Sequence, residues 1–155
     1  MERLNIGVDA ARKKIQHFCS YQERCHSEVK NKLFEMGLYP REVDELLAEL
    51  VRENFLDEER FAIAFAGGKF RMKNWGRVKI KKELKIRSVS EYCIRKSLRH
   101  IDEDDYHATL DRIAEKKAVT LTGNKFQKKG KLTRYLLQKG FEMDLVLPVA
   151  EKYVG

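Results

Sequence analysis

Proline, long apolar runs and β-type patterning are all scarce in this chain of 155 residues. Only two prolines are present, and no alternating run of Val, Ile, Thr and aromatic residues is long enough to predict a sheet. No stretch approaches the ~20 apolar residues of a membrane span. Residues 1–4 include an acid and do not begin an apolar signal segment. These absences predict an all-α, cytoplasmic protein with no membrane span.

Cysteine is also rare, with Cys19, Cys25 and Cys93 forming an odd and scattered set. Such a set fits a reducing compartment better than a disulfide framework. His17 and His26 lie close to the first two cysteines, so a zinc site has to be considered. Residues two apart on a helix point in different directions, and the spacing matches no CxxC or HxxxH ligand pair. We therefore predict buried or half-buried helix residues here, and no metal or other cofactor.

What the sequence does contain is a pattern of six apolar positions that occurs three times. The copies begin at Val29, Ile80 and Leu132, and each reads as two short helices separated by a tight turn. A unit of this size cannot bury its apolar face alone and must pack on its neighbours. We expect three tandem three-helix repeats, residues 1–54, 55–101 and 102–155, in an elongated, curved helical array. The eighteen positions are Val29, Leu33, Leu38, Val43, Leu47, Leu50, Ile80, Leu84, Val89, Ile94, Leu98, Ile101, Leu132, Leu136, Phe141, Val146, Ala150 and Tyr153.

Helix start and stop residues support nine helices, three in each repeat. Ser27, Asp57 and Asp102 are candidate N-caps. Pro40 suits the first turn of a helix, where its missing N–H costs nothing. Gly37 is placed to end a helix and reverse the chain, as are Gly140 and its neighbours in the third copy.

Charge is distributed unevenly along the chain, whose formal net charge is +8. Residues 69–99 contain twelve Lys or Arg and two Glu, a net charge of +10, whereas residues 27–60 carry five basic and ten acidic residues, a net of −5. A basic block of this kind binds phosphates by releasing counterions, without reading sequence. Nucleic acid is the predicted partner, with an acidic protein groove or membrane headgroups as alternatives.

The helix expected around residues 77–86 concentrates this charge. Val78, Ile80 and Leu84 are predicted to form its apolar stripe, with cations over the remainder. Trp75, just before this helix, could stack on a base, but we expect it to pack between helices. The predicted contacts with nucleic acid or a protein partner are Lys69, Arg71, Lys73, Arg77, Lys79, Lys81, Lys82 and Lys85.

Two segments of the middle repeat, FLDEERFAIAF at 55–65 and NWGRVKIKKEL at 74–84, resemble the RecX family of bacterial regulators of the RecA recombinase. The chain departs from the family pattern at Glu58, where an aspartate is usual, and at Ser88, where a glycine is usual. Ser88 is expected to form its turn by capping the next helix. The residues that match, and that we expect to be mainly structural, are Leu56, Asp57, Arg60, Phe61, Ala62, Trp75, Gly76, Ile80, Glu83 and Leu84.

The resemblance implies a function. A family member would act on the RecA filament assembled on single-stranded DNA, in recombination, DNA repair and the SOS response. It would lower ATP hydrolysis and strand exchange and limit filament growth, and double-stranded DNA is a further expected ligand. Asp57 and Arg60 would act through a helix cap and an ion pair between repeats. Which recombinase surface is contacted is left open. The repeats themselves predict a monomer, because a repeat chain with polar ends has no evident self-complementary patch.

Two other functions were weighed against this one. Glu83 and Lys85 form an E-x-K pair, and the acids at 102–105 with His107 could imitate a metal site, but the sequence has no Walker A loop, GxGxxG or nucleophile elbow. We therefore predict a protein without enzymatic activity. The helix expected at 40–54 could belong to a sequence-specific helix-turn-helix reader, but it carries five acids that would repel phosphates.

Overall fold

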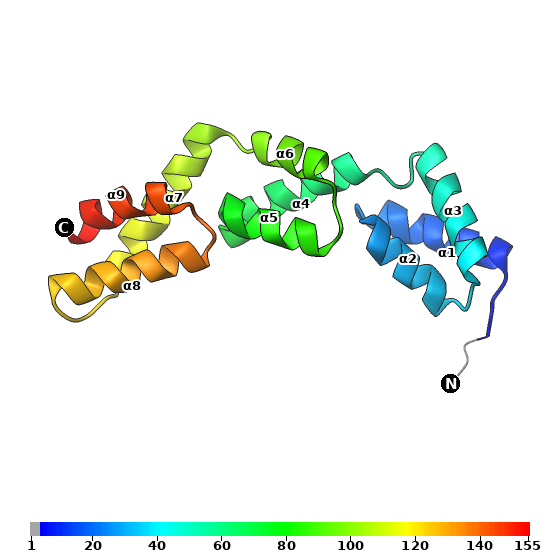
Figure 1. Cartoon of the computed structure of the whole chain (residues 1–155), viewed down its shortest axis with the longest axis horizontal. Coiled ribbons are helices and arrows are strands. Elements are labelled where there is room, and N and C mark those ends of the chain that lie inside the picture. The colour runs from blue at the N-terminus through cyan, green and yellow to red at the C-terminus, as the bar shows by residue number, and fades with distance from the viewer. Residues whose placement is uncertain (1–3) are drawn as a thin grey trace.

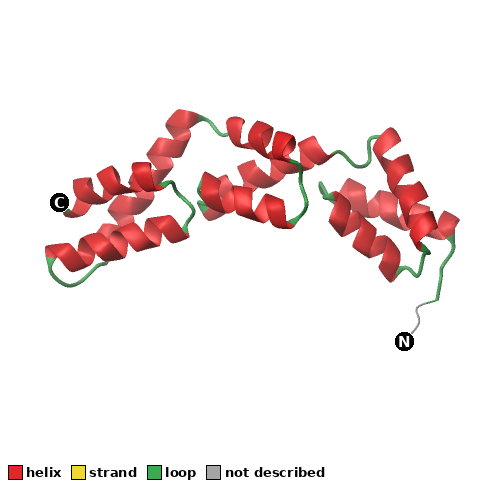
Figure 2. Ribbon diagram, in the orientation of Figure 1, coloured by secondary structure: helices red, strands yellow, loops and turns green. Residues whose placement is uncertain are grey.

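The computed structural model describes residues 4–155, which fold into nine helices and no strand (Figures 1 and 2). The prediction of an all-α fold is confirmed. Residues 1–3, the start of the first expected repeat, lie outside the described residues. Within residues 4–155, no helix is long and apolar enough to cross a membrane. The helices are α1 (Val8–Tyr21), α2 (His26–Glu35), α3 (Pro40–Arg52), α4 (Glu58–Lys73), α5 (Arg77–Ile86), α6 (Glu91–Arg99), α7 (Glu103–Ala118), α8 (Lys125–Gln138) and α9 (Met143–Val154).

The helices gather in consecutive threes along one elongated, curved array, with the two termini at opposite ends (Figure 1). We refer to α1–α3, α4–α6 and α7–α9 as repeats one, two and three. Helices α8, α5 and α2 follow one another along the same edge of the array (Figure 1). Each contact along this edge joins the end of one helix to the start of the next. The edge therefore presents helices from all three repeats in a row.

The recurring apolar positions are the inner faces of the second and third helix of each repeat. Fifteen of the eighteen are buried, and Leu47, Leu98 and Tyr153 are half-buried. Burying each such side chain contributes roughly 1.5–3 kcal/mol. The sequence period thus marks the contacts that hold each helix pair together.

The turn between the second and third helix of each repeat requires one residue with positive φ. Gly37 and Gly140 have φ values of 85° and 99°, and Ser88 takes the same role with a φ of 61°. A left-handed conformation costs a non-glycine residue roughly 1–2 kcal/mol. The prediction that Ser88 caps the next helix is wrong, because Ser90 is the cap of α6 and accepts a hydrogen bond from the Cys93 amide (3.3 Å).

Two of the three predicted N-caps are confirmed. Asp57 accepts a hydrogen bond from the Arg60 amide (2.9 Å), and Asp102 accepts one from the Asp105 amide (3.0 Å). Ser27 is not a cap, because α2 already begins at His26. The preceding residue, Cys25, instead donates its amide to the Glu28 carboxylate (3.3 Å), which closes the first turn from within.

The apolar core is divided into two parts. Repeat one encloses its own cluster, which includes Ile15, Leu33 and Leu50. Repeats two and three share a single continuous cluster that runs from Phe61 to Ala150 and also includes Cys25, the residue before α2. The chain therefore consists of one three-helix unit with its own core and one six-helix unit with a common core, and Cys25 packs into the second core.

Close contact between two glycines closes the joint between repeats two and three. The Gly76 amide donates to the Lys139 carbonyl (2.8 Å), and the Val78 amide donates to the Gly140 carbonyl (2.9 Å). A Cβ atom at position 76 would overlap the carbonyl group of Gly140. Behind this contact, the Tyr106 ring lies between Phe70 (5.7 Å) and Phe141 (5.1 Å). The start of α5 and the end of α8 are so close that neither position has room for a side chain, and both must be glycine.

We predict that Gly76→Ala destabilises the protein by about 2 kcal/mol, because the added methyl group must push the two backbones apart. Thermal unfolding followed by circular dichroism should show a midpoint lower by several degrees, at roughly 2–4 °C per kcal/mol. Gly68→Ala is the matched control, since a Cβ atom there meets nothing within 4 Å and α4 is already helical. The control should leave the midpoint unchanged or raise it; equal losses in both variants would contradict the tight joint.

Candidate nucleic-acid interface

The predicted contact residues of α5 point in two directions instead of forming one stripe. Successive residues on an α-helix are rotated by about 100°. Lys79 therefore points away from Lys81, about 160° around α5, and Lys82 lies between Lys79 and Lys85. Lys85 is on the side of Lys81 and pairs with Glu91 (3.4 Å). Val78, predicted to belong to the apolar stripe, is 53% exposed, whereas Ile80 and Leu84 are buried. That part of the prediction is wrong, and the buried stripe of α5 is narrower than the sequence indicated.

The basic residues at the end of α4 divide in the same way. Lys69 and Lys73 are four residues apart and lie on one side of the helix. Arg71 lies on the other side, beside Gly67, in a pocket that Asp102 and Asp105 also line. Arg71 thus faces acids at the start of α7. It does not join the other two cations.

Trp75 lies just before α5, next to the side of α4 that carries Lys69 and Lys73. Its ring is half-buried and packs edge-on against Phe65, with centroids 6.3 Å apart. The ammonium groups of Lys69 and Lys79 lie 5.1 Å and 4.5 Å from the Trp75 ring. Trp75 therefore packs against Phe65 and gathers two cations from different helices.

Helix α8 brings a further cation to the same place. The Lys139 ammonium donates to the Lys73 carbonyl (3.4 Å), and the Lys139 backbone carbonyl accepts a hydrogen bond from the Gly76 amide. We call Lys69, Lys73, Lys79 and Lys139 the junction cluster. Among the described residues, none of these four side chains lies within ion-pair distance of an acid. The cluster joins α4, α5 and α8 and leaves its charge available to an anion.

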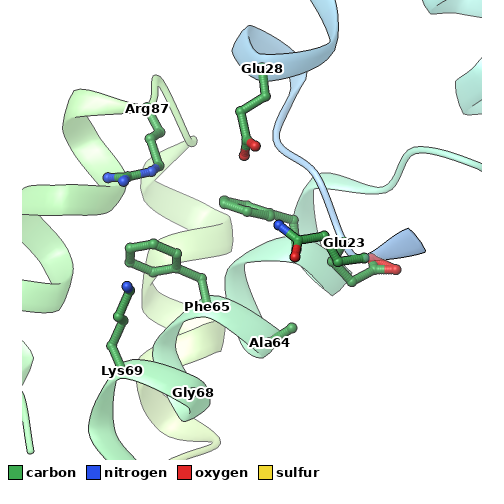
Figure 3. A pocket seen from close by; sticks show the side chains of 9 residues that line it. Glu23, Glu28, Ala64, Phe65, Gly68, Lys69 and Arg87 are labelled. Atoms are coloured by element: carbon green, nitrogen blue, oxygen red, sulfur yellow. The ribbon is translucent and has the colours of Figure 1, made fainter. Parts of the chain in front are cut away.

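At its other end the cluster borders a cleft between repeats one and two, with a volume of about 570 Å³. Figure 3 shows Phe65 between Lys69 and Arg87, with Glu28 of α2 on the opposite wall. The Arg87 guanidinium lies 4.7 Å from the Phe65 ring and pairs with Glu83 (3.0 Å). Cations and acids thus face one another across this cleft, so it is less suited to a polyanion than the junction cluster.

Arg77 is not a free cation, although the sequence placed it among the contact residues. Its guanidinium binds Glu103 (2.6 Å) and Glu142 (2.8 Å) and lies 3.9 Å from the Tyr106 ring. Its side chain is 21% exposed. Arg77 therefore fastens α5 to α7 and to the start of α9, across the joint between repeats two and three.

Tyr106 completes this fastening from inside the core. Its hydroxyl accepts a hydrogen bond from the Arg77 amide (2.9 Å) and donates one to the Glu142 carboxylate. Burial and the hydrogen bond to Glu142 raise the pKa of the Tyr106 hydroxyl well above its ordinary value. The tyrosine therefore stays protonated and keeps donating.

The residues that match the RecX pattern lie mainly inside the molecule. Leu56, Phe61, Ala62, Ile80 and Leu84 are all buried. The charged members make contacts between elements. Arg60 pairs with Glu23 of the segment after α1 (2.6 Å), and Glu58 accepts a hydrogen bond from the Ser90 amide (2.6 Å).

A second basic region lies in repeat three and was overlooked in reading the sequence. From residue 116 to residue 141 the chain has eight basic residues and no acidic one. Lys129 is paired with Glu151, and Lys117 lies 4.7 Å from the Tyr135 ring. The charge count that singled out residues 69–99 would have found this region too. The eight residues are Lys116, Lys117, Lys125, Lys128, Lys129, Lys131, Arg134 and Lys139.

The groups considered for metal binding or catalysis have other roles. Among the described residues, no group of three or more His, Cys, Asp or Glu is arranged to hold a metal ion. Asp102 caps α7 and Glu103 binds Arg77. Burial raises the pKa of the thiols of Cys19, Cys25 and Cys93, which makes them poor nucleophiles.

We predict that two substitutions on α5 change stability by different amounts. Arg77→Ala leaves Glu142 without its cation and should destabilise the protein by about 2 kcal/mol. Lys81→Ala removes an exposed side chain and should change stability by no more than about 0.5 kcal/mol. Urea unfolding of the two variants measures both effects. Equal stability of the two would show that Arg77 does not fasten the repeats.

Comparisons with known proteins agree with the geometry. Residues 57–98 match the family model described as "RecX, second three-helix domain", and residues 103–149 match "RecX, third three-helix domain". A protein named "Regulatory protein RecX" from Clostridium perfringens is 32% identical over 124 residues, which are 78% of this chain and 58% of that protein. One of the same name from Pelodictyon phaeoclathratiforme is 33% identical over 139 residues, 83% of this chain and 85% of that protein.

Solved structures show the same fold at lower identity. The crystal structure of RecX from Lactobacillus salivarius has a TM-score of 0.84 at 19% identity, and the match covers 94% of this chain and 96% of that one. The chain spans 58% to 63% of the clostridial relatives and most of the Pelodictyon protein. Its two matched three-helix domains and its likeness over most of a full relative establish that the chain belongs to the RecX family.

Proposed function

We propose that this chain regulates the RecA recombinase by binding the filament that RecA forms on single-stranded DNA. It lowers ATP hydrolysis and strand exchange in that filament and limits filament growth, without catalysing a reaction of its own. Family membership supports the recombinase as partner. One observation supports the proposed binding of nucleic acid. Helices α8 and α5 lie in a row (Figure 1), and cations of both meet at the junction cluster.

The array suits a long polyanion better than a compact one. Helices α8 and α5 are 14 and 10 residues long and lie end to end, so together they extend over roughly 36 Å at 1.5 Å per residue. Unpaired cations occur along this length and allow contact with successive phosphates of one strand. Affinity should accordingly fall with salt, and sequence should matter little.

A sequence-specific DNA-binding protein without a recombinase partner is the alternative. The acids of α3 weigh against it, because several serve the fold of repeat one. Glu49 pairs with Arg12 (2.7 Å), and Glu42 accepts hydrogen bonds from Asn5 (2.9 Å) and the Tyr39 amide (3.0 Å). A helix that is acidic and engaged in this way is poorly suited to enter a major groove. Competition with nonspecific DNA separates the two functions, since a backbone binder is displaced.

We use "junction side" for the junction cluster together with the neighbouring Lys82 of α5. We predict that reversing charge on the junction side weakens binding to single-stranded DNA by at least about tenfold at moderate salt. The variant is Lys73→Glu, Lys79→Glu and Lys82→Glu, and the slope of log affinity against log salt should become shallower by about 2. The matched control reverses three cations on the other sides of the same helices, Arg71→Glu, Lys81→Glu and Lys85→Glu. Equal losses in both triple variants would refute the assignment of the junction side.

The regulatory function is tested on the recombinase itself. We expect substoichiometric amounts of this protein to lower the rate of ATP hydrolysis by its cognate RecA on single-stranded DNA, with filaments assembled beforehand. The Lys73/Lys79/Lys82 variant should suppress this rate less effectively than the parent. An unchanged rate at excess protein, with DNA binding intact, would reduce the function to general nucleic-acid binding.

A further inference from the structure

Helix α8 carries an exposed apolar stripe that the basic region does not explain. Phe126 in its first turn is 86% exposed. Four residues on, Gly130 lies on the same side, and a Cβ atom there would meet nothing within 4 Å. Thr133 and Leu137 continue the stripe at helical spacing. These residues line an open groove of about 500 Å³.

Cations stand on both sides of this stripe. At about 100° per residue, Lys129 falls on one side of the line from Phe126 to Leu137, and Arg134 falls on the other. Both line the groove. Lys129 is shared with Glu151 of α9, whereas Arg134 is exposed and has no ion pair among the described residues. The groove thus combines a flat aromatic surface with positive charge at its edges.

The cations of α8 repel one another and lower the stability of the helix, and a bound polyanion would remove this repulsion. Lys125, Lys128, Lys131 and Arg134 follow one another at intervals of three residues, and α8 contains no acid to separate them. Like charges at such spacings destabilise an isolated helix by a few tenths of a kcal/mol per pair. Gly130 in the helix interior costs up to a further ~1 kcal/mol. Neither feature stabilises the protein alone, so both point to something that lies on this surface.

We propose that the groove of α8 is a second nucleic-acid site that takes unpaired bases, with one base stacked on Phe126 beside Gly130. An exposed aromatic ring with cations at its edges is the arrangement by which proteins hold single strands. The stripe is about 16 Å long, so it accommodates no more than about five stacked nucleotides at ~3.4 Å each.

The charge of α8 favours a nucleic acid over an acidic protein as the occupant. Lys129 and Arg134 stand at the edges of the groove, and α8 contains no acid. Lys139 of the junction cluster lies on the opposite side of α8, near the Tyr135 ring, so a strand would have to pass around the end of α8 to reach the cluster. An acidic protein would need a matching surface of the same length, whereas a strand supplies evenly spaced phosphates by its chemistry. This proposal rests on the proposed function in one respect, because both require the same single strand to bind.

The binding test uses the full chain and no recombinase. Phe126→Ala should weaken binding to an oligothymidine of about 15 nucleotides by roughly tenfold, as expected for loss of one stacking contact. Binding to duplex DNA of the same length should change less than about twofold, because paired bases are not free to stack. Val119→Ala is the matched control, since Val119 is 83% exposed at the end of α7 and lies outside the groove. It should leave both affinities unchanged.

A conservative replacement gives an independent readout. Phe126→Trp should retain affinity for oligothymidine, and its emission should be quenched when the oligomer binds, beyond any change that Trp75 shows in the parent. Unchanged single-strand affinity in Phe126→Ala, or equal loss on single strands and duplex, would overturn the proposal. A Phe126→Ala variant that binds DNA normally but no longer suppresses RecA would assign the groove to a protein partner and also overturn it. Loss of binding in the Lys73/Lys79/Lys82 variant alone would leave the proposed function standing.

Discussion

The close approach of Gly76 and Gly140 is the contact on which the arrangement of repeats two and three depends. It lets α5 begin against the end of α8, so the backbone donors of one helix meet carbonyls at the end of the other. The ionic and aromatic contacts of Arg77 and Tyr106 form only because the two helix ends meet in this way. Any side chain at position 76 would separate the donors from their acceptors and weaken these contacts together.

The same joint places the candidate interface. Lys79 lies one turn beyond Gly76, and Lys139 immediately precedes Gly140. Backbone contact between the two glycines therefore brings Lys139 of repeat three to the end of α4, near the place where Lys69 and Lys79 gather at Trp75. A junction of helix ends, and not a single basic helix, concentrates the charge. Like charges held in this way repel one another, and an anion that binds them relieves the repulsion.

The all-α fold and the repeat period could be predicted from the sequence because apolar spacing reports directly on which side of a helix is buried. Val29, Leu33 and Leu50 are buried as their spacing predicts. The direction of each cation could not be predicted in the same way. Arg77 and Lys81 look alike in a charge count, and only the positions of Glu103 and Glu142, far along the chain, distinguish them. Val78 shows the converse, since an apolar residue in a short helix can face outward.

The division of the core affects how the chain folds as it is synthesised. Repeat one has all its core partners once Leu56 has left the ribosome, so it can fold while the remainder is still being made. The shared core needs Val146 and Ala150 of the last helix, and Phe61 and Ile80 must wait for them. For most of translation the six-helix unit thus exposes apolar surface. The acid-free stretch of α8, made just before the last helix, gives this late intermediate a strong positive charge that opposes self-association.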